Sequence, residues 1–350
     1  MKGSMQRVTR VLNHEKPDRI PLFDLLANDA VLTHFNNGRP VDIGDDTAAI
    51  RALTRATDGT RFTYFAPMAE REEQLASGQS RIFQRWTIWT SNRYFDSTES
   101  YAVNKAAEIR TREETLLSPV EYDCGEFYHL QRKVLTVLGD DYFFPVYGPS
   151  PGLMDIIEEV GLEFFSYCLA DCEEVIIRLL EVQTAHACRW AEALPSDDPF
   201  SSVFIGEDIA YSKGPMVSPN WMRQHYFPKL AMVIDAMHAR RKRVIFHSDG
   251  DINPIMDDLV ACGIDVLNPI DTSANMCLDI LHAKYPRLIF AGGIDINLLS
   301  TGDQRAIRDA VHKAIDDTQG QILVGSSSEV MNCVPLNAYL ALRDAVINYN

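Results

Sequence analysis

His247 and Asp249 stand two residues apart, directly after the apolar run at residues 243–246. That run predicts a buried parallel strand. Asn253 and Pro254 then predict the start of a helix, with asparagine as the N-cap and proline at the first position. Ligands of parallel α/β proteins bind at the carboxyl ends of the strands. A histidine and a carboxylate at this place can hold a metal ion, shuttle a proton or bind a substrate.

Polar and mostly acidic residues follow the other predicted strands as well. If the strands form one barrel, these residues share one bowl at its mouth. With His247 and Asp249, Asp208 completes the predicted catalytic group. Asp271 and Asp295 have a structural alternative, because each could cap the helix that follows it. The predicted substrate-binding residues are Asp24, Asn28, Tyr147, Asn268, Asp295 and Ser328.

Strands and helices alternate along most of the chain, which favours a parallel sheet. Helices are predicted at residues 219–237, 254–262, 276–283 and 303–315, and from 335 onward. The predicted strands are residues 20–24, 61–65, 142–146, 201–205, 243–246, 264–268, 287–291 and 321–325. Eight strands with intervening helices favour an α/β fold of the (β/α)8 TIM-barrel type. An open doubly wound sheet is the alternative.

The connection between the second and third predicted strands is unusually long. Residues 67–141 contain an aromatic stretch at 86–95 that predicts β-structure, and helical patterns at 105–117 and 128–138. Long connections at the carboxyl face commonly form lids or substrate pockets. We therefore expect residues 1–350 to be a single barrel domain, with 67–141 as an excursion over its mouth.

Composition limits the class of partner and the compartment. The net charge is −16, with 49 acidic and 33 basic residues, which argues against nucleic acid and anionic membranes as partners. No apolar run approaches the length of a membrane span, and no secretory signal is visible. The seven cysteines form no Cys-x-x-Cys pair, so a reducing cytoplasm is the expected location.

Several motifs together resemble the uroporphyrinogen decarboxylase superfamily. This superfamily includes the decarboxylases themselves and zinc methyltransferases that move methyl groups between corrinoid proteins and thiols or folates. The resemblance implies a single (β/α)8 barrel, in agreement with the strand count. It rests on residues 16–21, 214–219, 247–250, 263–269, 292–295 and 335–342, in the same order and spacing.

Two departures from the decarboxylases predict a different substrate. Their first strand is followed by an arginine-rich loop that grips the carboxylates of the tetrapyrrole, whereas residues 23–29 contain no arginine. Ser328 stands where they carry a histidine. An octa-acid entering an acidic bowl would meet uncompensated repulsion. Uroporphyrinogen itself is therefore not the expected substrate.

The zinc methyltransferases use a His-x-Cys pair and a later cysteine as metal ligands. This chain keeps His247 but has Asp249 and Ser328 at the cysteine positions. Serine is a poor ligand, so Glu207 or Glu329 could take its place, and the predicted metal ligands are His247, Asp249, Glu207 and Glu329. Oxygen in place of thiolate weakens zinc binding or shifts the preference toward harder divalent metals. Whether a metal binds remains open.

Three functions are compatible with this sequence. The leading hypothesis is a methyltransferase-type enzyme, with a corrinoid protein or a small methylated compound as the methyl source. The first alternative is a lyase that decarboxylates a small carboxylated substrate, with His247 as general acid. The second is a non-catalytic barrel that binds a small ligand or a corrinoid. The expected partners are a small-molecule substrate, a corrinoid protein and, in a homodimer, a second copy of the chain.

Overall fold

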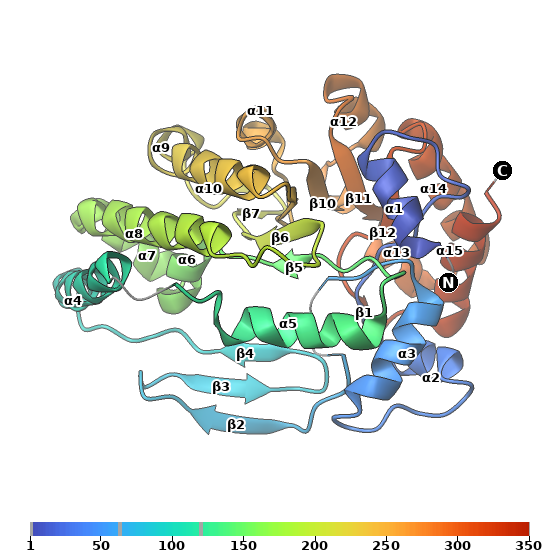
Figure 1. Ribbon diagram of the computed structural model, residues 1–350, viewed down its shortest axis with the longest axis horizontal. Helices are drawn as coiled ribbons and strands as arrows, with labels where there is room; N and C mark the ends of the chain where they lie inside the picture. Colours follow the sequence, from blue (N-terminus) through green and yellow to red (C-terminus); the bar gives the residue numbers. More distant parts are fainter. Residues whose placement is uncertain (1–2, 62–64, 119–121, 350) are drawn as a thin grey trace.

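Six parallel strands form the centre of the computed structural model, which describes residues 3–61, 65–118 and 122–349. Figure 1 shows this sheet with helices on its outer side. The order of the strands is β12-β11-β10-β9-β6-β5. Their bounds are β5 Val146–Tyr147, β6 Ser202–Gly206, β9 Arg243–His247, β10 Val266–Ile270, β11 Ile289–Ile294 and β12 Ile322–Ser326. The predicted α/β fold with a parallel sheet is confirmed.

The register of the sheet places Gly206, His247 and Asn268 side by side on three neighbouring strands. Gly206 of β6 pairs with His247 of β9, and His247 pairs with Asn268 of β10. All three lie at or near the carboxyl ends of their strands.

Two further chain segments join the sheet through single residues. Leu22 bridges Val324 of β12, Phe23 bridges Gly59, and Gly59 bridges Phe143, just before β5. A side chain at position 59 would place its Cβ 2.8 Å from the carbonyl oxygen of Phe143, so only glycine permits this approach. The predicted strand at 61–65 falls largely on 62–64, outside the described residues, and the bridging position lies upstream of it.

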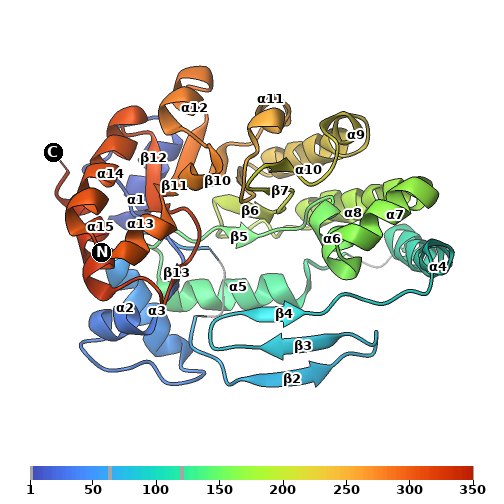
Figure 2. The same ribbon diagram turned by 180° about the vertical axis from the view of Figure 1, so that it is seen from behind.

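The helices cover the sheet from outside (Figure 2). The 3-10 turns are η1 Asn253–Ile255 and η2 Thr272–Ala274. Two short strand pairs lie outside the central sheet: β1 Leu26–Ala27 with β13 Val330–Met331, and β7 Ala210–Tyr211 with β8 Gly214–Pro215. The helices outside the long excursion are α1 Ser4–Leu12, α2 Asp29–Phe35, α3 Asp46–Ala56, α6 Leu153–Val160, α7 Leu162–Asp171, α8 Glu173–Glu192, α9 Pro219–His225, α10 Phe227–Ala239, α11 Met256–Ala261, α12 Leu278–Lys284, α13 Ile296–Thr301, α14 Gln304–Asp317 and α15 Leu336–Ile347.

Two helical regions differ from the prediction. The helix predicted at 219–237 is divided into α9 and α10 at Tyr226. Pro228 lies in the first turn of α10, where the missing N–H costs nothing, and it could not lie in the interior of one continuous helix. Between β5 and β6 the chain forms three successive helices, α6 to α8, which the sequence pattern did not predict.

The long connection contains a small antiparallel sheet and two helices. Strands β2 Arg71–Gln74, β3 Ser80–Phe83 and β4 Ile88–Thr90 pair in sequence order, and α4 Thr98–Leu117 and α5 Gly125–Leu138 follow. The predicted β-structure and helices of this segment are thus present. The small sheet projects at one side of the molecule, apart from the central sheet (Figures 1 and 2).

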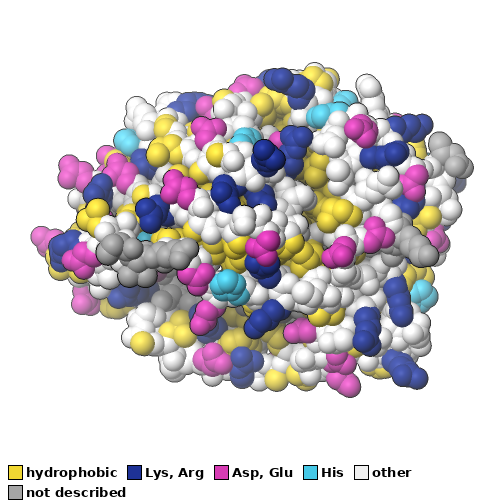
Figure 3. Space-filling model, in the orientation of Figure 1, with side chains coloured by type: hydrophobic (Ala, Val, Ile, Leu, Met, Phe, Trp, Pro, Cys, Tyr) yellow, Lys and Arg dark blue, Asp and Glu magenta, His cyan; other side chains and the backbone are white. Residues whose placement is uncertain are grey.

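The inside of the central sheet is apolar until the strands end. Phe23, Phe143, Phe204, Ile245 and residues of the following strands form one buried cluster, and Val8 and Val11 of α1 pack against it. On the face shown in Figure 3, acidic and basic side chains are interspersed. No helix among the described residues is long and apolar enough to cross a membrane.

Candidate functional site

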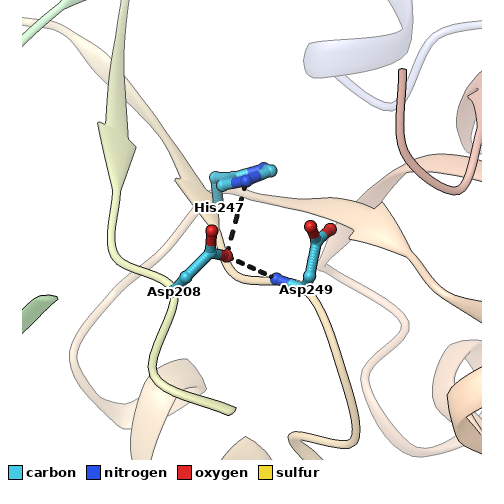
Figure 4. Close-up of side chains that lie close together, drawn as sticks. All are labelled: Asp208, His247 and Asp249. Atoms are coloured by element: carbon cyan, nitrogen blue, oxygen red, sulfur yellow. Dashed lines mark hydrogen bonds and ion pairs between the residues drawn. The ribbon is translucent and has the colours of Figure 1, made fainter. Parts of the chain in front are cut away.

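Asp208, His247 and Asp249 lie together at the ends of β6 and β9 (Figure 4). One possible ligand atom from each residue lies within 4.8 Å of the others. His247 Nε2 is 3.6 Å from Asp208 Oδ1, and the backbone N–H of Asp249 donates to the same oxygen at 2.8 Å. This N–H fixes the Asp208 carboxylate in front of the histidine ring. The three residues predicted as catalytic are therefore neighbours.

A hydrogen bond from the next strand sets the protonation of His247. Its Nδ1 lies 3.0 Å from Oδ1 of Asn268, which can only accept, so Nδ1 carries the proton. Burial lowers the pKa of His247, and the charge of Arg61 lowers it further. The ring is thus neutral, with the lone pair of Nε2 directed to the side of Asp208. Asn268 thus contacts the histidine, and its predicted role in substrate binding stays a prediction.

Asp249 adds a second carboxylate that has little solvation. Its Oδ1 is buried and has no hydrogen-bond partner among the described residues. Burial raises the pKa of Asp249 to about 7, and the negative charge of Asp208 contributes to the rise. Nε2 of His247, the Asp208 carboxylate and Oδ1 of Asp249 are therefore three acceptors gathered in one place. Such an arrangement suits a cation or a proton donor.

Beside this group, His247 and Asn268 line a small cavity together with Asp24, Arg61 and Ser328. The Arg61 guanidinium lies 5.5 Å from the ring centre of Phe204 and pairs with Glu329 at 2.8 Å. Arg61 was not predicted as a site residue. It belongs to the segment that bridges through Gly59, and a single arginine in a loop carries no sequence signal of its own.

Asp24 lies at the floor of the small cavity and is fully buried. Its oxygens contact the backbone N–H groups of Leu25 and Ser326 and, at 2.7 Å, the hydroxyl of Ser326. That hydroxyl also lies 2.7 Å from the carbonyl oxygen of Ser328. Burial raises the pKa of Asp24 to about 7. The Ser326 hydroxyl and backbone N–H donate to Asp24 and oppose this rise.

Glu207 adjoins Asp208 in sequence but has a different role. Its carboxylate accepts from the backbone N–H groups of Gly152 and Met154, both at 2.8 Å, at the amino end of α6. Burial raises the pKa of Glu207 to about 7. Consecutive residues at a strand end point in opposite directions, so Glu207 holds a helix while Asp208 faces His247. Glu207 lies outside the three-residue group, and the geometry does not favour it as a metal ligand.

The remaining predicted residues lie around this group. Asn28 caps α2 and donates to the carbonyl oxygens of Met331 and Val334. Asp295 caps α13, and Asp271 caps η2, which confirms the structural alternative for both. Their roles in substrate binding remain predictions. Ser328 donates to Glu329 at 3.3 Å, and Glu329 in turn is paired with Arg61.

Tyr147 lies on the other side of Phe204 and borders a much larger cavity. The ring centres of Tyr147 and Phe204 are 5.4 Å apart, as are those of Phe204 and His247. The larger cavity has a volume of about 780 Å³ and is lined by the end of β5 and by α4, α5, α6 and α8. Met154 lines it too, and its sulfur accepts from the N–H of Asp208 at 3.2 Å. Two cavities therefore adjoin, separated by Tyr147, Phe204 and Met154.

Comparison with known proteins places the chain in a family. The family model described as uroporphyrinogen decarboxylase (URO-D) matches residues 161–349, more than half of the chain, including Asp208, His247 and Asn268. The chain belongs to the uroporphyrinogen decarboxylase family. The predicted resemblance is thus confirmed.

One solved structure is similar over the entire chain. A methyltransferase from Methanosarcina mazei aligns with a TM-score of 0.66 at 15% identity and covers 100% of this chain and 99% of its own. At this identity the likeness establishes the fold alone. A chitinase from Chromobacterium violaceum aligns at 9% identity, covering 94% of this chain and 100% of its own, with a TM-score of 0.39, too low to bear on the fold. No curated protein sequence matches this member of the uroporphyrinogen decarboxylase family.

Proposed function

We propose that this protein is a methyltransferase-type enzyme of the uroporphyrinogen decarboxylase family. The methyl group would move between a small substrate or a corrinoid protein and an acceptor, at the centre formed by Asp208, His247 and Asp249. The observation that carries this proposal is that possible ligand atoms of these three residues lie within 4.8 Å of one another, and that Oδ1 of Asp249 is buried with no hydrogen-bond partner among the described residues. Family membership supports an enzyme, and the similar fold of a methyltransferase is consistent with this activity.

The donor set fits a divalent metal. A metal-binding histidine usually donates its other ring N–H to an oxygen acceptor, as Nδ1 of His247 does to Asn268. Two carboxylates with one imidazole suit zinc or a harder divalent metal better than a thiolate-selective one. Asp208, His247 and Asp249 would hold the ion, and Glu329 would remain with Arg61. A divalent ion at this place lowers the pKa of a bound acceptor thiol or hydroxyl.

The chain's own groups prepare the site before any substrate enters. Asn268 keeps Nε2 of His247 unprotonated, and the N–H of Asp249 keeps the Asp208 oxygen in front of it. Phe204 packs against the histidine ring and excludes water from its face. These fixed contacts reduce the reorganisation that substrate binding would otherwise require.

We also propose that the sheet closes into a (β/α)8 barrel and that residues 1–350 form one domain. Three bridges support closure, because they lead from β12 through residues 22–23 and Gly59 to Phe143 before β5. Residues 67–141 would then be the excursion over the mouth. A corrinoid protein as partner fits the methyltransferase proposal, and a homodimer stays a prediction.

Decarboxylation of a small carboxylated substrate is the second candidate, and Arg61 favours it. A guanidinium binds carboxylates in a two-pronged geometry, and Arg61 borders the same small cavity as His247. One arginine matches a substrate with one or two carboxylates. It does not match the many carboxylates of uroporphyrinogen.

Metal analysis and an activity assay together test the proposal. Purified protein should contain about one equivalent of divalent metal, and His247→Ala should lose it. His312→Ala is the matched control, because His312 is exposed on α14. The loaded wild type should demethylate a methylated corrinoid in the presence of a thiol, and the His247→Ala protein should not. Stoichiometric CO2 release from a small acid, with no demethylation, would instead establish the lyase.

A further inference from the structure

The larger cavity lies outside the candidate metal centre and contains an unusual set of charges. About 780 Å³ is the volume of pockets that take small organic ligands. Lys105 and Arg112 are its two cationic side chains among the described residues. Lys105 pairs with Glu108 and Glu159, and Arg112 pairs with Glu108 at 2.8 Å. The cations of the wall are thus matched by carboxylates of the protein itself.

Two further carboxylates on the wall have no such match. Asp155 and Glu158 stand one turn apart on α6, and neither carboxylate has a hydrogen-bond or ion-pair partner among the described residues. Desolvation by the surrounding protein raises the pKa of both carboxyls; the charge of Arg112 opposes the rise at Asp155, and the charge of Asp155 adds to the rise at Glu158. Both side chains are exposed, so the cavity presents two unpaired carboxylates to a guest. A cationic guest would relieve the repulsion between them.

The other polar and aromatic groups of the cavity also suit a cation. Oε1 of Gln183 is buried and has no hydrogen-bond partner among the described residues, so it adds an acceptor. Tyr147, Tyr128 and Trp190 contribute aromatic rings to the lining. Tyr128 and Trp190 are buried behind the cavity wall, whereas Tyr147 is half-buried and offers its ring to a guest. Aromatic rings next to carboxylates recognise alkylated ammonium groups.

We propose that this cavity binds an organic cation with an alkylated ammonium head, held by Asp155 and Glu158. The head would lie at α6, and the rest of the molecule would extend along the aromatic side of the cavity. The claim that this cation is the methyl-bearing substrate rests on the proposed function. The claim that the cavity binds such a cation depends on the cavity alone. Met154 and Tyr147 connect the two places, because each borders the cavity and adjoins the centre at His247.

Calorimetry with choline and its neutral isostere 3,3-dimethylbutan-1-ol tests the binding site directly. The two probes share a shape and differ in charge. We expect choline to bind at least about tenfold more tightly, as one desolvated ion pair or cation–π contact would give. Asp155→Asn and Glu158→Gln should each weaken choline binding about three- to tenfold, and the double variant more. Glu114→Gln is the control, since Glu114 is exposed on α4 and does not line the cavity.

The outcomes separate this inference from the proposed methyl transfer. Equal binding of both probes, absence of choline binding, or an equal effect of Glu114→Gln would overturn the cation site, whatever the enzyme does. Choline binding that depends on Asp155 and Glu158, in a protein without metal or methyl transfer, would support the cation site and sink the proposed function. Circular dichroism of each variant ensures that a loss of binding is not a loss of fold.

Discussion

The cavity at His247 and the larger cavity behind Tyr147 differ in almost every physical respect. The first is small, and its polar groups are held by hydrogen bonds, Asp24 to Ser326, His247 to Asn268 and Arg61 to Glu329. The second is wide, and two of its carboxylates have no partner among the described residues. Under the proposed function, the group at the first cavity would hold a small ion. The second has the room for a substrate that the first lacks.

This division suggests that reactivity and substrate recognition are separated in space. A site for a reactive centre needs little volume, because a few fixed groups suffice and water must be excluded. A site for an organic ligand needs area and adaptable contacts. Phe204, Tyr147 and Met154 form the boundary between the two cavities. Variants on either side should therefore affect one property and leave the other.

The largest separation should come from a pair of carboxylate variants, one in the group at His247 and one in the larger cavity. Asp208→Asn keeps an oxygen that can accept from Asp249 but removes the charge that would bind a metal. We expect metal affinity to fall at least about a hundredfold, since losing a ligand costs more than losing a neighbour of one. Choline binding should not change. Asp155→Asn should do the reverse, and a variant that lowered both by the same factor would mean that the cavities are one site.

The sequence predicted the second half of the fold better than the first. Of the central sheet, β6, β9, β10, β11 and β12 begin within two residues of their predicted positions, because each is a continuous apolar run bounded by glycine or a helix signal. In the first half, residues 22–23 and Gly59 join the sheet by single bridges. One bridging residue leaves no periodic pattern, so these segments could be predicted only approximately.

The sequence predicted the location of the candidate site more reliably than the roles of its individual residues. Strand ends brought Asp208, His247 and Asp249 into one prediction, and they do lie together. The sequence could not show which of two adjacent carboxylates, Glu207 or Asp208, faces inward. Nor could it find Arg61, whose contact with Glu329 joins parts of the chain that only the folded sheet brings together.

The burial of Asp24 predicts that the free energy of unfolding depends on pH. The pKa of Asp24 is raised from 3.8 to about 7, so the folded state binds this proton more tightly than the unfolded state. The resulting stability is fully present below about pH 4 and is lost as the pH rises to about 7, by an amount on the order of a few kcal/mol. Asp24→Asn resembles the protonated acid and should remove this loss. Urea unfolding of both proteins at pH 4.5 and 7.5 measures it, and parallel pH profiles would contradict it.

A smaller effect on metal affinity is expected from changing Asn268, which positions His247 but is not one of the proposed metal ligands. Asn268→Ala removes the acceptor for Nδ1 of His247 and lets the ring change tautomer and orientation. Metal affinity should fall about 10- to 100-fold. Asn268→Asp retains an acceptor and should recover most of the affinity. A purely structural role would predict that both variants lose stability together, and that metal affinity of the folded fraction stays unchanged.

The smallest expected effect concerns the boundary between the two cavities, which a substitution at Gly206 would disturb. An alanine Cβ at Gly206 would lie 2.0 Å from the hydroxyl oxygen of Tyr147, so the ring must move, although the contact is only with the end of a side chain. We expect Gly206→Ala to lower the free energy of unfolding by about 1 kcal/mol. Because Tyr147 borders the larger cavity, choline binding should weaken about threefold while metal content stays at the wild-type level. Adding Tyr147→Phe removes the nearest clashing atom and should restore part of the stability. Loss of metal in Gly206→Ala would instead mean that the boundary positions His247, since Gly206 pairs with it in the sheet.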